Sequence, residues 1–144
     1  MTIAAILRHK GGMVTSVRPE QSLADVAGEL TRQHIGAAPV LDPTGVLVGI
    51  LSERDIVGAL ARLGAAALDL PARAVMTAHP RTATQATTVA EAMRMMTEGR
   101  FRHLPVVDHG RMIGIVSIGD VVKARMMQQE TEVDSLKAYV SGAA

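Results

Sequence analysis

Two serine–aspartate pairs have residue types and a spacing suited to holding a phosphorylated nucleoside. Ser52 and Asp55 are separated by two residues, and Ser117 and Asp120 repeat that spacing further along the chain. Each pair follows an apolar run that predicts a buried strand and opens a segment that predicts a helix. The unpaired N–H groups and the dipole at a helix start favour an anion such as phosphate. A carboxylate one turn into the helix can accept hydrogen bonds from both hydroxyls of a ribose. The two junctions are therefore candidate nucleotide sites.

The same spacing is also that of an ordinary helix cap, in which a serine and the residue three positions later exchange hydrogen bonds with the backbone. The chain has this pattern twice more, at Ser22 with Asp25 and at Thr88 with Glu91. Taken alone the pattern favours capping, because caps are routine at helix starts. Capping and ligand binding are compatible for the serines, so the decision depends on the surrounding sequence.

That surrounding sequence is duplicated. Residues 38–42 (APVLD) align with residues 104–108 (LPVVD) at an offset of 66 positions. Further on, residues 49–55 align with residues 114–120 at an offset of 65, so one residue is lost within an Asp- and Gly-rich turn, where a hairpin tolerates a change of length. Each copy is predicted to form a short strand, a helix, a strand, a tight turn, a strand and a helix, with a proline-broken connector around residues 68–76.

The first helix of each copy carries apolar residues at positions i, i+3, i+4 and i+7, the pattern of a half-buried helix. These residues are Leu23, Val26, Ala27 and Leu30 in the first copy and Val89, Ala92, Met93 and Met96 in the second. A copy of this size cannot close a core by itself. We therefore expect the two sheets to pack together about a pseudo-twofold axis, with clefts where the copies meet.

The repeated segments resemble the CBS family, in particular small stand-alone bacterial proteins with two CBS repeats, called Bateman modules. The resemblance is carried by the Pro-Val-x-Asp start of each hairpin, by GILSERD at residues 49–55 and by GIVSIGD at residues 114–120, and it runs from about Val14 to Lys123. It implies an α+β, sandwich-like fold built from tandem βαββα repeats. We expect residues 1–144 to form one module, with repeat 1 at 8–64, repeat 2 at 72–128 and a helical tail at 129–144.

The resemblance also implies clefts that bind AMP, ADP, ATP, NAD or S-adenosylmethionine, and association into flat dimers. Together with the spacing, it makes Ser52, Asp55, Ser117 and Asp120 the expected ribose and phosphate contacts. Adenine needs an apolar slot and a few backbone hydrogen bonds. The residues expected to form that slot are Thr15, Val17, Ala38, Pro39, Thr82, Thr84, Leu104 and Pro105.

The basic residues beside these sites do not repeat. Arg102 and His103 of the second copy align with Gly36 and Ala37, and Arg54 of the first copy aligns with Gly119. Arginine offers a planar fork to phosphate and histidine a tunable donor, and the resemblance implies phosphate contacts for both, although exposed loop residues are the alternative. We therefore expect two inequivalent clefts, one of which holds phosphate more strongly.

Gly49 and Gly114 lie inside predicted strands, where glycine weakens the element unless the missing side chain is needed. A β-bulge and the close approach of a ligand both explain a glycine at these positions. The sequence leaves the two explanations open.

Composition disfavours several other functions. The formal net charge of +1 and the presence of only two aromatic residues, Phe101 and Tyr139, argue against a nucleic-acid partner. The chain has no cysteine, no His-Glu-x-x-His motif and no nucleotide-hydrolysing, esterase or dinucleotide-binding signature, so we expect neither a metal nor catalysis. Apolar runs are too short to span a bilayer and residues 1–10 do not resemble a secretory signal, which predicts a cytoplasmic protein without a membrane partner.

The expected function is that of a sensor in which a bound adenosine nucleotide, AMP, ADP, ATP or NAD, stabilises one arrangement that an unknown target protein then recognises in trans. The alternative is a structural interaction module whose clefts are vestigial. In the tail, Val133, Leu136 and Val140 share one helical face, enough to dock on the module or on a second copy. We expect a homodimer.

Overall fold

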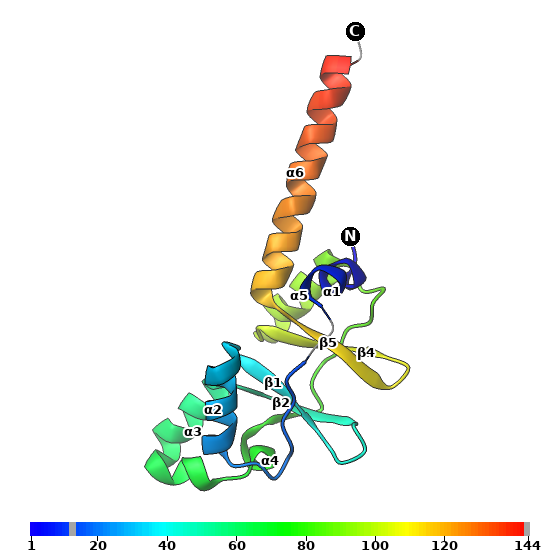
Figure 1. The fold of residues 1–144 in the computed structure, drawn as a ribbon. Coiled ribbons are helices and arrows are strands. Elements are labelled where there is room, and N and C mark those ends of the chain that lie inside the picture. Colours follow the sequence, from blue (N-terminus) through cyan, green and yellow to red (C-terminus); the bar gives the residue numbers. More distant parts are fainter. Residues whose placement is uncertain (12–13, 143–144) are drawn as a thin grey trace.

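The computed structural model describes residues 1–11 and 14–142 and combines helices with two small antiparallel sheets, so the α+β prediction is confirmed (Figure 1). In chain order the elements are α1 (Ile3–Lys10), α2 (Leu23–Gln33), β1 (Ala37–Leu41), β2 (Leu47–Ser52), α3 (Glu53–Leu63), the 3₁₀ helix η1 (Gly64–Asp69), α4 (Ala72–Val75), β3 (Thr77–Ala78), α5 (Val89–Gly99), β4 (His103–Asp108), β5 (Arg111–Ser117) and α6 (Ile118–Gly142).

The two hairpins have matching registers and differ in their turns. Strand β1 pairs with β2 and β4 with β5, and β3 adds a short third strand beside β2. In the first hairpin the Asp42 N–H donates to the Val46 carbonyl (2.9 Å) across a three-residue turn. In the second, Asp108 pairs with Arg111 across His109 and Gly110, both with positive φ, as a two-residue turn requires. The prediction that the copies differ by one residue in this turn is confirmed.

The short strand predicted at the start of each copy is reduced to a single residue. Val17 donates to the Pro39 carbonyl (3.0 Å) and accepts from the Leu41 N–H (2.9 Å), and Ala83 makes the same pair of bonds with β4. A turn begins at the next residue in both copies, closed by hydrogen bonds from Gln21 to Arg18 and from Thr87 to Thr84. The chain turns away before a ladder forms, which is why the structure has isolated bridges here.

Helices α2 and α5 begin and end at equivalent positions. The Ser22 hydroxyl accepts from the Asp25 N–H, and Thr88 and Glu91 form a complete capping box. Both helices bury the predicted stripe, with five of its residues among the most buried in the chain; these five are Leu23, Val26, Val89, Ala92 and Met96. The predicted helix starts and their buried faces are confirmed.

Each repeat has its own core, and each core is completed by a helix that lies outside the repeat. The first core includes Ala67 of η1 and Ala72 of α4, whereas the second includes Ile3 and Ile6 of α1. The structure thus has one core cluster in each repeat, although the sequence predicted that a copy of this size cannot close a core by itself, because these helices cover the apolar surface that a repeat alone leaves open. Residues 8–10, assigned from the sequence to the start of repeat 1, therefore lie against repeat 2.

Helix α6 extends well beyond the residues that pack in the second core. Val121 and Ala124 pack into the second core, but every residue from Gln129 to Gly142 is exposed, and this half of the helix projects away from the body (Figure 1). The tail predicted at 129–144 thus continues α6 without a break, and its last two residues lie outside the described part of the chain. Across residues 1–11 and 14–142, no helix has the length and apolar character needed to cross a bilayer.

Gly49 and Gly114 are explained by close approach within the protein and by a neighbouring bulge. A β-carbon on Gly49 would overlap the Met76 side chain and lie 2.9 Å from the Thr77 carbonyl oxygen of β3. A β-carbon on Gly114 would lie 2.6 Å from Leu7 Cδ2 of α1. In both hairpins the strand register shifts immediately beyond the pair that contains the glycine. Both positions thus let a flanking segment of the chain lie directly on the sheet.

Gly49→Ala is expected to lower the free energy of unfolding by about 1–3 kcal/mol, because a methyl group there overlaps backbone as well as side chain. Urea denaturation monitored by circular dichroism measures the change. Gly58→Ala is the matched control: it lies in α3, where the new β-carbon meets only Arg62 Nη1 at 3.6 Å, and helix propensity predicts a gain of about 0.5–1 kcal/mol. Equal or greater stability of the Gly49 variant would contradict the packing described here.

Candidate functional site

Both serine–aspartate pairs form capping boxes. The Asp55 N–H donates to Ser52 Oγ (3.2 Å), and the Ser52 N–H donates to Asp55 Oδ2 (2.9 Å). The Asp120 N–H donates to Ser117 Oγ (3.1 Å), and the Ser117 N–H donates to Asp120 Oδ2 (2.8 Å). The capping interpretation is therefore confirmed for both pairs, and it fixes each carboxylate at the start of a helix.

Capping uses only one oxygen of each carboxylate. Within the described part of the chain, every hydrogen bond to Asp55 or Asp120 ends on Oδ2. Both side chains are partly exposed, and that of Asp120 keeps 27% of its surface accessible. Each carboxylate can therefore accept a further hydrogen bond at Oδ1 without breaking the cap.

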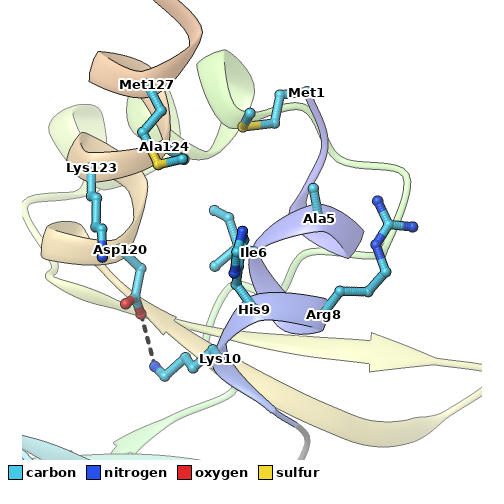
Figure 2. Close-up of a pocket in the computed structure, with 10 residues that line it drawn as sticks. All are labelled: Met1, Ala5, Ile6, Arg8, His9, Lys10, Asp120, Lys123, Ala124 and Met127. Atoms are coloured by element: carbon cyan, nitrogen blue, oxygen red, sulfur yellow. Dashed lines mark hydrogen bonds and ion pairs between the residues drawn. The ribbon is translucent and has the colours of Figure 1, made fainter.

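Lys10 at the end of α1 makes the second junction different from the first. Its ammonium donates to Asp120 Oδ2 (2.7 Å), as Figure 2 shows. It also donates to the Ile115 carbonyl oxygen of β5 (2.9 Å). At the repeat offset of 66, the position aligned with Lys10 is Met76, which carries no charge and lies on Gly49. The Lys10 ammonium thus bridges the edge of β5 and the carboxylate of Asp120. In repeat 1 the apolar side chain of Met76 lies at the corresponding place.

The pKa of Asp120 lies below its ordinary value. Partial burial of the carboxyl group works in the opposite direction and raises the pKa, but the hydrogen bonds from Lys10 and Ser117 and the positive charge of Lys10 outweigh it. Asp120 is therefore ionised at neutral pH and acts only as an acceptor, the state required to hold a diol.

His103 lies at the second junction and also contacts the first repeat. It pairs with Ser117 in the β4–β5 register. A β-carbon on Gly36 would lie 3.4 Å from both His103 Nε2 and Glu53 Oε1, so side chains from the two repeats converge at this glycine. The junction at Asp120 is therefore next to the contact between the repeats.

The pKa of His103 is lowered from its ordinary value. Burial of the ring is the largest cause, followed by the positive charge of Lys10; Glu53 and Asp120 partly offset these effects by raising the pKa, and Arg102 lowers it slightly. His103 is therefore neutral at neutral pH, and an anion brought near the ring would favour its protonated form.

Arg54 and Arg102 are both exposed, and neither joins an ion pair among the described residues. The backbone of Arg102 is equivalent to that of Gly36 at the first junction. The Arg102 carbonyl accepts from the Ile118 N–H (2.8 Å), as the Gly36 carbonyl accepts from the Glu53 N–H (2.9 Å). Arg102 lies in the loop before β4, the alternative considered from the sequence, whereas Arg54 lies in the first turn of α3.

The residues expected to form the adenine slot are not gathered around a cleft. The side chains of Val17, Ala38 and Leu104 belong to the two cores and are at most 2% exposed. Pro39 and Pro105 are also buried, Thr15 is partly buried, and Thr82 and Thr84 are exposed. Successive residues of β1 and β4 point to opposite faces of the sheet, and those from Ala37 to Val40 and from Leu104 to Val106 are all buried. Both faces of these strands are therefore covered by protein at these positions.

A cleft of about 600 Å³ runs between α1 and α6, with Asp120 and Lys10 at one end (Figure 2). Its floor and rim are formed by Met1, Ala5, Ile6, Arg8, His9, Lys10, Asp120, Lys123, Ala124 and Met127. The sequence predicted clefts between the repeats; this one lies instead between the two terminal helices, because α1 packs on repeat 2. Sequence reasoning missed Lys10, since nothing in the repeat indicates where the segment preceding it packs.

Metal ligands do not gather at either junction. Among residues 1–11 and 14–142, no three His, Asp or Glu side chains come together in a group that could hold a metal ion. Independence of ligand binding from metal stays a prediction.

Comparison with known proteins identifies the fold and the repeat. The family model of the CBS domain matches residues 13–62 and 72–127. The crystal structure of the CBS-domain containing protein ATU1752 from Agrobacterium tumefaciens is 44% identical, covers 87% of this chain and 99% of its own, and superposes with a TM-score of 0.85. The mitochondrial CBS domain-containing protein CBSX3 of Arabidopsis thaliana is 33% identical over 98% of this chain and 72% of its own length.

A third similar protein was solved with a ligand. The structure of CBSX2 in complex with AMP is 29% identical, covers 89% of this chain and 98% of its own, and has a TM-score of 0.74. The duplicated strand–helix junctions, the two matches of the family model and the similarity over nearly the whole chain agree with one another. The chain belongs to the CBS-domain family, as a pair of CBS repeats in one regulatory module.

Proposed function

We propose that this CBS pair binds adenosine-containing nucleotides, AMP, ADP, ATP or NAD, at Asp55 and Asp120 and passes their presence to a separate target protein. The observation that carries the proposal is the pair of equivalent helix starts, each with a fixed carboxylate whose second oxygen is not used by the cap. A similar protein, CBSX2, was crystallised with AMP. Neither catalysis nor a metal is part of the proposal.

The chemistry of each junction suits a nucleotide. The ribose diol would donate to the aspartate, while backbone N–H groups at the starts of α3 and α6 favour a nearby phosphate. Arg54 at the first junction, and Arg102 with His103 at the second, supply donors to that phosphate. These groups differ between the copies, so the two sites should differ in phosphate affinity.

Lys10 links nucleotide binding at Asp120 to the position of α1. A diol that takes both oxygens of Asp120 competes with the Lys10 ammonium for Oδ2. Because Lys10 ends α1, losing this contact removes one of the bonds that hold α1 on β5 and α6. A ligand with greater affinity for the released state would shift the population of α1 positions, which a target protein can recognise.

Thermal denaturation with AMP, ADP, ATP and NAD tests the proposal directly. A ligand at a hundred times its dissociation constant should stabilise the protein by about 2.7 kcal/mol.

In titration calorimetry, Asp55→Ala and Asp120→Ala should each weaken nucleotide binding at one site by about 1–3 kcal/mol, the scale for losing a charged hydrogen bond. Glu91→Ala is the matched control, because it removes the same kind of capping box from α5. Absence of binding at millimolar nucleotide would reject the proposal.

Lys10→Met should strengthen binding of adenosine at the Asp120 site by about three- to tenfold, because the ligand no longer competes with an exposed ion pair worth about 1 kcal/mol. Adenosine is the appropriate probe since it has no phosphate for Lys10 to attract. Lys123→Met, which removes a cation from the same cleft without breaking the ion pair, should leave the affinity unchanged. Weaker binding by the Lys10 variant would identify Lys10 as a ligand contact.

Nucleotide affinity should rise as the pH falls from about 8 to 6, because a phosphate near His103 raises the lowered pKa of that ring and binding then takes up a proton. His103→Gln should lose this part of the pH dependence while keeping the part due to the nucleotide's own phosphate. Calorimetry in buffers of different ionisation enthalpy measures the proton uptake. Identical pH profiles in the two proteins would place His103 outside the phosphate site.

A further inference from the structure

The outer half of α6 does not pack against the rest of the described chain, residues 1–11 and 14–128. All residues from Gln129 to Gly142 are exposed, and four of them are large and apolar; these are Val133, Leu136, Tyr139 and Val140. Isolated helices of this length are marginal in water, and most helices are stabilised by packing of an apolar face. The projecting half of α6 gains no such stabilisation from the part of the chain that the structure describes, and its apolar side chains are available to a partner.

The apolar residues of α6 follow a heptad spacing. Positions 122, 126, 129, 133, 136 and 140 are separated alternately by four and three residues, and five of the six are apolar. In heptad notation Met126, Val133 and Val140 are a positions, and Val122, Gln129 and Leu136 are d positions. The exposed fractions of the apolar ones run from 42% at Val122 to 69% at Val140, so this stripe, the α6 seam, stays uncovered even beside the body.

Charges flanking the α6 seam select a second copy of the same helix in parallel. In a parallel pair each g residue faces the following e residue of the other helix. Arg125 then faces Glu130 of the second copy, and Glu132 faces Lys137 of the second copy, two attractive pairs that the twofold axis doubles. An antiparallel pair in the same seam brings Glu130 against Glu130 and Glu132 against Glu132, which is repulsive.

We propose that α6 forms a parallel, in-register, two-stranded coiled coil with α6 of a second copy, along the α6 seam from Val122 to Val140. β-Branched residues at two of the three a positions and leucine at one d position favour two strands, and Gln129 supplies a polar layer that fixes the register. The twofold axis then runs along the helices, and the two modules lie at the same end. The observations that support this assembly do not include nucleotide binding.

Sedimentation equilibrium of the full chain gives the oligomeric state. The wild type is expected to be a dimer, and Leu136→Glu should raise its dissociation constant by about tenfold or more, since it places a charge in the seam. Ala138→Glu adds the same charge on the opposite face of α6 and should leave the dimer intact. Circular dichroism checks that both variants stay folded. A monomeric wild type, or a dimer indifferent to Leu136→Glu, overturns the proposal.

Orientation is tested by charge reversal. Glu132→Lys and Lys137→Glu should each weaken the dimer by about two- to fivefold, because each creates a like-charge pair across the seam. The double variant should restore the wild-type affinity, as the pair is then attractive again with its signs exchanged. Failure of the double variant to recover would exclude the parallel arrangement.

Disulfide trapping gives a second test of orientation, because the chain has no cysteine of its own. In the parallel dimer Leu136 faces Leu136 of the second copy, so Leu136→Cys should form an intersubunit disulfide on mild oxidation. An antiparallel pair would place Leu136 against Met126. Ala138→Cys, on the outer face, serves as the control and should stay largely reduced. Equal cross-linking of the two variants would contradict an in-register seam.

Discussion

The backbone at the start of a helix must find hydrogen-bond acceptors, and in this protein that requirement shapes the candidate site. Strands β2 and β5 run directly into α3 and α6, so the first N–H groups of both helices lie at the edge of a buried sheet. Ser52 and Ser117 accept from these helices, and Asp55 and Asp120 return a bond to the preceding backbone. The cap holds each carboxylate in one orientation and uses only its Oδ2. The helix cap thereby leaves a fixed carboxylate oxygen that can accept one further hydrogen bond.

The two junctions are alike in backbone and unlike in surroundings, because the segments that cover the two repeats differ. Met76 lies over Gly49 in repeat 1, whereas Leu7 and Lys10 of α1 cover the corresponding strand of repeat 2. Lys10 brings a charge to Asp120 and contributes to the low pKa of His103. The difference between the two junctions therefore comes mainly from the segments that pack on the repeats. At the Asp120 junction, the ion pair depends on the position of α1.

Helix α6 connects the candidate site with the proposed assembly. It begins at the Asp120 cap and buries Val121 and Ala124 in the second core. From Gln129 to Gly142 it is exposed and does not pack against the rest of the described chain. Because α6 is one continuous helix, its base at the Asp120 cap and the α6 seam belong to the same element. The α1–α6 cleft lies at that base, where Lys10 and Lys123 face Asp120 (Figure 2).

The sequence alone predicted the repeat and the one-residue difference between the hairpin turns. It also predicted the helix starts at Ser22 and Thr88 and the buried faces of α2 and α5. These features depend on residues only a few positions apart, so local sequence patterns reveal them. The same logic identified both serine–aspartate pairs as caps and left their ligand role open. Only the tertiary structure decided that α1 packs on repeat 2, that each repeat has its own core, and that Lys10 binds Asp120. Those contacts join residues about a hundred positions apart, and no local periodicity records which apolar surface a short helix such as α1 will cover.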